Sequence, residues 1–167
     1  MIAAGRIIRR FFFPELSTGF LIRIGFIAFS AYLFFGYVCL PFWIQGGSME
    51  PTYRDGDFHF CWKGRYFFSD PNRYEVVAIR FAGSRIMLLK RIVALEGEEV
   101  EFRNGKLYVN GEEIEEPYVH YRRNWNLPPR RVEKGNVFVV GDNRGIDIEH
   151  HYLGQTDRAR IIGGPLW

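Results

Sequence analysis

The spacing of apolar and polar positions divides the 167-residue chain into two dissimilar parts. Residues 24–44 read IGFIAFSAYLFFGYVCLPFWI and contain no charged side chain. A helix of about 20 apolar residues crosses the hydrocarbon layer of a bilayer, so this run predicts one transmembrane helix that ends near Pro41. A cleavable signal peptide and a buried helix of a soluble protein are the alternatives. The length of the run, the lack of a small-residue cleavage pattern after it and the lack of a polar face favour a retained anchor.

After Gln45 the pattern changes to short alternating segments separated by turn residues. In the first of them, Phe58, Phe60 and Trp62 fall on one face of a strand. The dipeptides Asn104-Gly105 and Asn110-Gly111 are typical of two-residue hairpin turns and flank a short strand. The strands predicted in this way are 57–62, 75–81, 86–95, 106–109 and 136–140.

The fold class expected from this pattern is mainly β, a small barrel or sandwich preceded by one transmembrane helix. Residues 1–44 are expected to form the cytoplasmic N-terminus and the anchor, and residues 45–167 an extracytoplasmic domain. The stretch 121–133 (YRRNWNLPPRRVE) is expected to be an exposed loop.

The formal charge of +3 resides at the N-terminus. Four arginines precede residue 24 against Glu15 alone, and the remaining 18 basic and 18 acidic residues balance. Arginines before a membrane span keep that end in the cytoplasm, so the bulk of the chain is expected on the opposite side. No nucleic-acid partner is indicated.

Cys39 and Cys61 provide neither a disulfide framework nor a set of metal ligands, and we expect no metal or cofactor.

Three short segments carry candidate chemistry. The glycines of Gly46-Gly47-Ser48 allow a tight turn and a close approach of a substrate carbonyl, which the Ser48 N–H would bind as an oxyanion. Lys90 shares a strand face with Leu88 and Ile92, and burial among apolar side chains lowers a lysine pKa towards that of a general base. Gly141-Asp142-Asn143 ends a strand in a turn. From the residues alone, a plain loop, an edge-strand lysine and a structural turn remain the alternatives.

Together these segments resemble the motifs of type I signal peptidases, also called leader peptidases. Ser48 to Thr52 match the Ser-Met-x-Pro-Thr box, Lys90 to Val93 the Lys-Arg-Ile-Val box, and Gly141 to Arg144 the Gly-Asp-Asn-Arg box. The middle regions 104–111 and 116–119 are also similar. The resemblance extends over about residues 40–160, with the boxes in the family's order.

The resemblance implies a membrane-bound serine endopeptidase that removes signal peptides from exported preproteins after small residues. Ser48 is then the nucleophile and Lys90 the general base, with preprotein signal peptides and the lipid bilayer as partners. The form of the last box resembles bacterial members, which implies a bacterial plasma membrane. The supporting residues implied in the same way are Gly46, Gly47, Asp142, Asn143 and Asp147, and the residues implied for the substrate cleft are Phe42, Ile44, Met49, Leu88 and Leu89.

The last box departs from the family's pattern. Asp147 stands where the family has a serine that orients the catalytic lysine, and Glu149 and His151 stand where an Asp–Arg ion pair usually supports the site. A carboxylate beside Lys90 raises the lysine pKa and opposes general-base action. Asp147 therefore points away, forms a coupled neutral pair with Lys90, or marks a weak or inactive relative. Our hypothesis from the sequence is that Asp147 contacts Lys90.

Other functions fit parts of the pattern. A specialised relative would process one dedicated substrate, as the altered last box allows. A non-catalytic module would present a β domain at the membrane, although it would need neither Ser48 nor Lys90. A Ser-His-Asp hydrolase would use one of the four histidines, but no Gly-x-Ser-x-Gly elbow surrounds Ser48.

A group of aromatic residues falls in loop-like stretches of the predicted β domain. These side chains either dip into the outer leaflet of the membrane or pack in the protein core. They are Tyr66, Phe67, Phe68 and Trp125.

Overall fold

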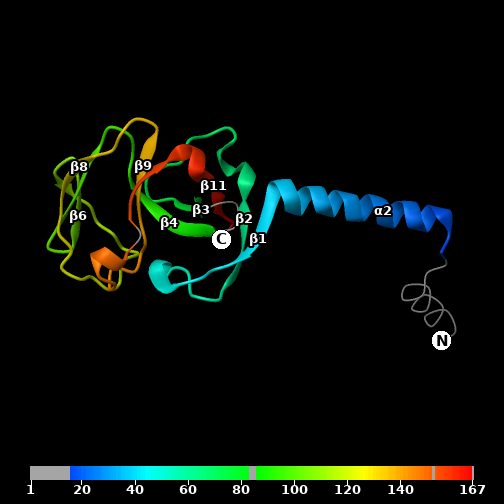
Figure 1. Ribbon diagram of the computed structural model, residues 1–167, viewed down its shortest axis with the longest axis horizontal. Helices are drawn as coiled ribbons and strands as arrows, with labels where there is room; N and C mark the ends of the chain where they lie inside the picture. Colours follow the sequence, from blue (N-terminus) through cyan, green and yellow to red (C-terminus); the bar gives the residue numbers. More distant parts are fainter. Residues whose placement is uncertain (1–15, 83–85, 152, 167) are drawn as a thin grey trace. The chain divides into compact units, whose positions relative to one another are not determined.

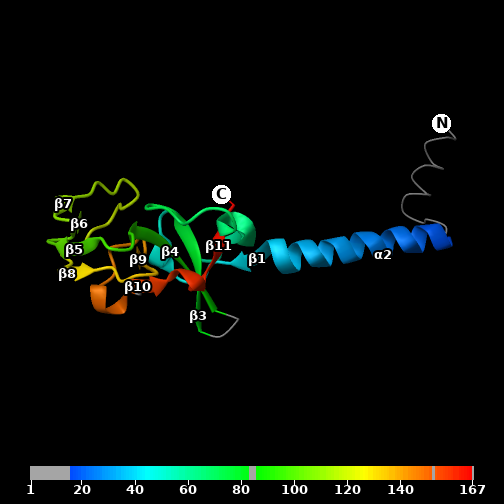
Figure 2. The ribbon, with the colours of Figure 1, turned by 90° about the horizontal axis from the view of Figure 1, so that it is seen from above.

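The computed structural model describes residues 16–82, 86–151 and 153–166, and the chain divides into two compact units, Met1–Val38 and Cys39–Trp167. The first unit contributes one helical segment, and the second carries two antiparallel sheets (Figures 1 and 2). The prediction of a mainly β fold with one N-terminal apolar helix is therefore confirmed.

The helical segment runs from Thr18 to Val38. Its α-helical part is α2 (Thr18–Leu33), where the Ser17 hydroxyl accepts a hydrogen bond from the Phe20 N–H at 3.3 Å and caps the helix. A π-helical stretch, η1 (Phe34–Val38), continues it. These 21 residues have a mean hydropathy of 1.7 and are unburied, so by length and composition the helix is suited to crossing a membrane.

The predicted anchor, residues 24–44, is displaced from the observed helix. The helix ends at Val38, and the next residues form strand β1 (Cys39–Trp43), in which Pro41 lies opposite Phe60. Proline lacks an N–H and is tolerated in edge strands, and β1 is an edge strand of its sheet. The last six residues of the predicted span therefore belong to the β unit, and the boundary lies after Val38 rather than after Ile44.

The larger sheet has seven strands in the order β1-β2-β11-β3-β4-β9-β10. Strand β4 lies in its interior between β3 and β9, with Val77 opposite Lys90 and Arg91 opposite Val140. Lys90 is therefore on an interior strand, not on an edge. The strands are β1 (Cys39–Trp43), β2 (Phe58–Trp62), β3 (Val76–Ala82), β4 (Ile86–Ala94), β9 (Asn136–Val140), β10 (Gly154–Asp157) and β11 (Ile161–Pro165), and the short turns η2 (Gly47–Met49), η3 (Lys63–Tyr66), η4 (Ile148–His150) and η5 (Arg158–Arg160) connect them.

The smaller sheet consists of β7 (Glu112–Glu113), β6 (Lys106–Val109), β5 (Glu99–Arg103) and β8 (Leu127–Arg131), in that order. Its first three strands are joined by the two predicted hairpin turns. Asn104-Gly105 has φ angles of 50° and 78°, and Asn110-Gly111 has 53° and 83°, the left-handed values that a two-residue type I′ turn requires. The five strands predicted from the sequence are all present, each within one residue of its predicted ends.

The prediction of an exposed loop at 121–133 is wrong. This stretch contains β8, and three of its apolar side chains are buried: Trp125, Leu127 and Val132 are 3%, 9% and 2% exposed. Each of them is isolated between charged residues, asparagines or prolines, so no continuous apolar pattern marks them in the sequence. Trp125 is consequently a core residue and not a membrane-contacting one.

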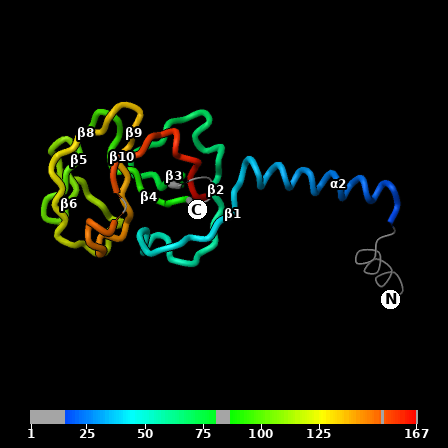
Figure 3. The backbone as a smooth tube through the Cα atoms, viewed as in Figure 1, coloured from blue at the N-terminus to red at the C-terminus, as the bar shows by residue number. Residues whose placement is uncertain are grey.

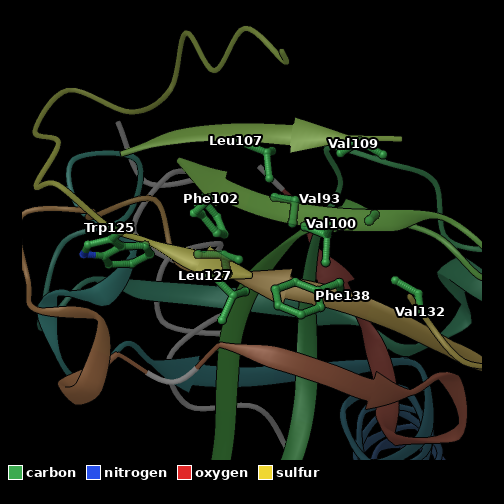
Figure 4. Packing of buried hydrophobic residues seen from close by; sticks show 11 residues of the cluster. Val93, Val100, Phe102, Leu107, Val109, Trp125, Leu127, Val132 and Phe138 are labelled. Carbon is green, nitrogen blue, oxygen red and sulfur yellow. The ribbon is translucent and has the colours of Figure 1, made fainter. Parts of the chain in front are cut away.

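The core of the smaller sheet extends onto β4 and β9 of the larger one. Figure 4 shows Phe102, Trp125, Leu127 and Phe138 converging on one another. The rings of Phe102 and Trp125 meet edge to face with centroids 5.6 Å apart, a favourable aromatic geometry. A second apolar cluster, which includes Ile44, Met49 and Leu89, packs on the larger sheet and reaches the surface at the candidate site described next.

Candidate active site

Ser48 lies in the connection between β1 and β2, in the short turn η2. Gly46 precedes this turn with φ of 89°, a left-handed value that favours glycine, and its N–H donates to Asp55 Oδ1 at 2.8 Å. Asn143 holds the turn from the other side: its backbone N–H donates to the Ser48 carbonyl at 3.0 Å, and its side-chain Nδ2 donates to the Gly47 carbonyl at 2.9 Å. The two predicted segments, 46–48 and 141–143, are thus in direct contact.

Glycine at position 141 is required by this contact. A Cβ atom placed on Gly141 would lie 2.2 Å from the Ser48 carbonyl oxygen and 2.7 Å from His151 Nε2. Both distances are far below van der Waals contact, and the first involves backbone that cannot move without displacing Ser48. The residue type at 141 therefore sets how closely the turn after β9 approaches the Ser48 loop.

Lys90 reaches Ser48 from the interior strand β4. Its side chain is only 3% exposed, and its Nζ donates a hydrogen bond to Ser48 Oγ at 2.9 Å. Burial lowers the pKa of Lys90 to about 8; the negative charge of Asp142 opposes this shift, and the positive charge of Arg144 adds to it. About a tenth of the lysine is consequently neutral at pH 7 and about half at pH 8, and the neutral form is the one that a general base requires.

The carboxylate of Asp142 is fully buried, and its negative charge is compensated by the guanidinium of Arg91. Arg91 donates to it twice, from Nε at 2.8 Å and Nη2 at 2.6 Å, and the Thr52 hydroxyl donates at 2.6 Å. A bidentate arginine pair of this kind is both strong and directional. It joins β4 to the turn after β9 one residue away from Lys90.

A second buried ion pair lies on the opposite side of the turn. Arg144 donates to both oxygens of Glu116, at 2.6 and 3.2 Å, and both side chains are at most 1% exposed. The guanidinium is also within 5.5 Å of the ring centroids of Phe102 and Trp125. The role of Glu116 was not predicted; its only signal was its place in the middle region that resembles the family.

His151 is bound to the same turn. Its Nε2 accepts the Gly141 N–H at 2.9 Å, and its ring lies 4.9 Å from that of Trp125. Burial lowers its pKa to about 3, and the charges of Lys90 and Arg144 act in the same direction. Glu149, by contrast, is exposed. Glu149 and His151 therefore form no ion pair among the described residues. Gly141 is held at its N–H by the neutral His151 ring and at its carbonyl by Arg144 Nε, which donates at 2.7 Å.

The hypothesis that Asp147 contacts Lys90 is wrong. The Asp147 carboxylate forms an ion pair with Arg123, and 54% of its side chain is exposed. In the part of the chain that the structure describes, Lys90 makes no ion pair. Of the three outcomes considered from the sequence, Asp147 pointing away is the one observed.

An apolar cleft of about 280 Å³ leads away from Ser48. All five residues expected to line a substrate cleft border it. Ile44, Met49 and Leu89 are buried at its floor, whereas Phe42 and Leu88 are half-buried. The full lining is Phe42, Trp43, Ile44, Gln45, Gly46, Ser48, Met49, Met87, Leu88 and Leu89, of which Met87 was not predicted.

Lys90 is buried, its pKa is lowered, and it is hydrogen-bonded to the Ser48 hydroxyl at the end of a cleft. This arrangement suits a serine hydrolase in which lysine takes the place of histidine. Comparison with known proteins agrees. The family described as signal peptidase, peptidase S26, matches residues 17–165, and the chain belongs to this family.

Two individual relatives give the same result. Signal peptidase I of Bacillus amyloliquefaciens is 33% identical over 134 residues, which cover 74% of this chain and 69% of that protein. Thylakoidal processing peptidase 1 of Arabidopsis thaliana is 35% identical over 146 residues, 81% of this chain and 43% of that protein. A crystal structure of a signal peptidase I from Enterococcus faecalis aligns with a TM-score of 0.46 and 27% identity, covering 57% of this chain and 97% of that chain.

The low pKa of His151 predicts a loss of stability in acid. The pKa is depressed from 6.5 to about 3 on folding, so the neutral ring stabilises the fold above pH 6.5, and this contribution is lost as the pH falls towards 3. Between pH 6.5 and 4 the loss is expected to be roughly 3 kcal/mol in the free energy of unfolding. Denaturant titrations at a series of pH values measure it.

His151→Gln should remove this pH dependence, because glutamine offers an acceptor for the Gly141 N–H and does not titrate in this range. His150→Gln is the matched control, since His150 is the exposed neighbour of His151. A wild-type slope that persists unchanged in His151→Gln contradicts the assignment.

Proposed function

We propose that this chain is a type I signal peptidase that removes signal peptides from exported preproteins, with Ser48 as nucleophile and Lys90 as general base. The observation that carries the proposal is the 2.9 Å hydrogen bond between Lys90 Nζ and Ser48 Oγ beside an apolar cleft. Membership of the signal peptidase family supports the reaction.

The chemistry begins with the neutral form of Lys90. It accepts the Ser48 hydroxyl proton while Ser48 Oγ bonds to the scissile carbonyl carbon. Backbone N–H groups, that of Ser48 among them, bind the oxyanion, because Gly46 has no side-chain hydroxyl to contribute. The Lys90 ammonium then protonates the leaving amine as the C–N bond breaks. Lys90 next takes a proton from water, whose oxygen attacks the acyl carbon. The Lys90 ammonium returns this proton to Ser48 Oγ as the ester bond breaks, which releases the signal peptide with a free carboxylate and restores the neutral lysine.

The supporting residues act on Ser48 and Lys90 indirectly, by fixing the loop and the strand that carry them. Asn143 fixes the carbonyls of Gly47 and Ser48, and Asp142 fixes the strand that carries Lys90 through its pair with Arg91. Gly46 and Gly47 keep the approach to the Ser48 N–H free of side chains. Asp147 has no place in the resting dyad, because its carboxylate is held by Arg123.

The cleft sets the substrate preference in this proposal. Its buried lining residues Ile44, Met49 and Leu89 are apolar, which fits the small apolar side chains that precede a signal-peptide cleavage site. An extended substrate segment would lie between the Phe42–Gly46 segment and Met87–Leu89 of β4, where both chains offer backbone groups for hydrogen bonding.

We place the protein in a bacterial plasma membrane, with its N-terminus in the cytoplasm and the β unit on the outer face. The apolar helix Thr18–Val38 and the three arginines before it support this topology. These arginines, Arg6, Arg9 and Arg10, lie outside the described residues.

Exposed aromatic side chains support contact between the β unit and lipid. Phe67 and Phe68, which follow η3, are 73% and 101% exposed, and the edge strand β1 and its neighbour β2 expose Trp43, Phe58 and Trp62. Aromatic side chains of this kind favour the membrane interface. The observed burial of Trp125 removes it from the set proposed from the sequence.

No observation favours the alternatives considered from the sequence. A non-catalytic module has no need of a buried lysine on a serine hydroxyl, and a Ser-His-Asp hydrolase would need a histidine at Ser48, where Lys90 lies instead. A single dedicated substrate would require a feature of the cleft that rejects generic signal peptides, and its described lining contains no charged residue.

Removal of either member of the dyad tests the proposal. Ser48→Ala and Lys90→Ala are each expected to reduce cleavage of a preprotein with an Ala-x-Ala site by about 10³-fold or more, because nucleophile and base act as a unit. Gel-based cleavage assays with the full chain in detergent measure the rate. Ser69→Ala and Lys134→Ala alter exposed residues of the same types and should retain wild-type rates. Full cleavage by Ser48→Ala would refute the dyad.

The pKa of Lys90 predicts the acid side of the pH profile. Protonated Lys90 cannot accept the Ser48 proton, so kcat/KM should be constant well above pH 8 and fall about tenfold per unit below it. Stopped assays between pH 5.5 and 10 measure this limb. A rate that stays level from pH 9 down to pH 6 is the contrary result.

Contact with lipid is tested on the β unit without its helix. The isolated residues 39–167 should sediment with liposomes, and Phe67→Ser combined with Phe68→Ser should reduce the bound fraction severalfold. Tyr121→Ser is the control, since Tyr121 is 69% exposed but belongs to a different part of the unit. Circular dichroism verifies the fold of each variant, and equal binding by all of them would contradict the lipid contact.

A further inference from the structure

A second cavity, of about 120 Å³, lies beside the cleft and shares Leu88 with it. Strands β3, β4, β9 and β10 and the turn η5 contribute to its lining. In Figure 3 the orange-to-red chain leads from β10, which pairs with β9, through η5 to β11, which pairs with β3. The second cavity therefore lies where the last segments of the chain meet the strands that carry the site.

Lys90 borders the second cavity and also contacts Ser48. Alternate residues of a strand face the same side, so Leu88 and Lys90 share one face of β4, and Ile79, which lies opposite Leu88, shares it too. These three residues line the second cavity, while Lys90 Nζ donates to Ser48 Oγ at 2.9 Å. The dyad therefore lies between the cleft, which Ser48 lines, and the second cavity, which Lys90 lines.

A positive charge lies at the outer end of the second cavity. Arg160 and Lys90 both line this cavity, and because Arg160 is exposed whereas Lys90 is buried, the cavity runs from solvent towards the dyad. The charge of Arg160 is not among those that shift the pKa of Lys90. The guanidinium therefore lies away from the amine, at the end of the cavity that faces solvent.

Arg160 makes no ion pair within residues 16–82, 86–151 and 153–166. Its neighbour Arg158, by contrast, is paired with Asp70 and Glu96 at 3.7 and 3.9 Å. The hydroxyl of Thr156, which also lines the second cavity, has no hydrogen-bond partner in the same part of the chain. A guanidinium beside a hydroxyl donor suits a carboxylate ligand.

The proposed reaction determines which part of a substrate lies near the second cavity. Lys90 protonates the leaving amine, so this nitrogen lies at Lys90 Nζ as the C–N bond breaks. The signal peptide occupies the cleft on one side of the dyad, and the leaving amine begins the released protein on the other side. The first residues of the released protein therefore lead from Lys90 towards the second cavity.

We propose that the second cavity binds the first residues of the released protein, and that Arg160 selects substrates with an acidic side chain there. The inference deepens the proposed function and rests on the Ser48–Lys90 dyad. An extended chain advances about 3.3 Å per residue, so the first three residues cover roughly 10 Å beyond the scissile bond. A carboxylate at one of these three positions pairs with Arg160.

The expected preference is modest because Arg160 is exposed. An exposed ion pair changes an equilibrium by up to about fivefold, so glutamate should be preferred over glutamine about two- to fivefold in kcat/KM at the position that reaches Arg160. A lysine at the same position should be cleaved more slowly than glutamine. The preference should decrease as the salt concentration rises, because salt screens charges that are exposed to solvent.

The experiment measures this preference by competition between two preproteins in one reaction with the full chain in detergent. Each preprotein carries an Ala-x-Ala site, and the members of a pair differ in one residue, glutamate or glutamine, at the first, second or third position after the cleavage site. The initial rates of formation of the two products give the ratio of the kcat/KM values. This ratio does not depend on how much of a variant is folded.

Substitutions of Arg160 should change this ratio in a defined order. Arg160→Lys retains the charge and should keep the preference for glutamate, whereas Arg160→Gln should abolish it. Arg160→Glu should reverse it, so that a lysine at the same position is preferred over glutamine. Arg130→Glu is the matched control and should keep the wild-type ratio, because Arg130 is an exposed arginine of β8 and does not line the second cavity.

Two results overturn the inference. The first is a wild-type ratio of one at all three positions, since no acidic side chain is then selected. The second is a preference for glutamate that persists unchanged in Arg160→Gln, since the selection then arises from another group. Failure to cleave any of these preproteins is a different outcome, because it contradicts the proposed function and not only the role of Arg160.

Discussion

The structure depends on keeping one lysine out of water. An ammonium group buried in a protein is unfavourable unless it is paired or neutral, and Lys90 is left without an acidic partner of its own. Its single described side-chain hydrogen bond goes to a hydroxyl, which suits the neutral amine as well as the ammonium. The free energy lost by burying the charge lowers the pKa of Lys90, so the neutral amine is populated at moderate pH.

This arrangement requires that the neighbouring charges be satisfied elsewhere. Arg91 and Arg144, one on either side of the turn after β9, each hold a carboxylate through two hydrogen bonds. Buried pairs of this type add little net stability but fix geometry when both partners are present. They connect the interior strand of the larger sheet with the smaller sheet, so the surroundings of Lys90 are defined by both parts of the β unit.

The sequence predicted features that depend on local chemistry and missed those that depend on distant partners. The hairpin at Asn104-Gly105 was predictable because two adjacent residues suffice to define its turn. The end of the helix before Pro41 was not, because pairing with β2 decides it, and the burial of Trp125 was hidden by its polar neighbours. The Ser48–Lys90 contact followed from family boxes, whereas the direction of Asp147 depends on an arginine 24 positions away.

The close approach of Gly141 to the Ser48 carbonyl has a consequence for how such a protein can change. The walls of the cleft are side chains, and a substitution there alters which peptide fits without moving the backbone. At Gly141 the Ser48 carbonyl oxygen occupies the space that a Cβ atom would need, so any other residue there displaces the turn that carries Ser48. The substrate specificity can therefore be changed by substitutions in the lining of the cleft. The contact between the Ser48 loop and the turn after β9, in contrast, requires glycine at position 141.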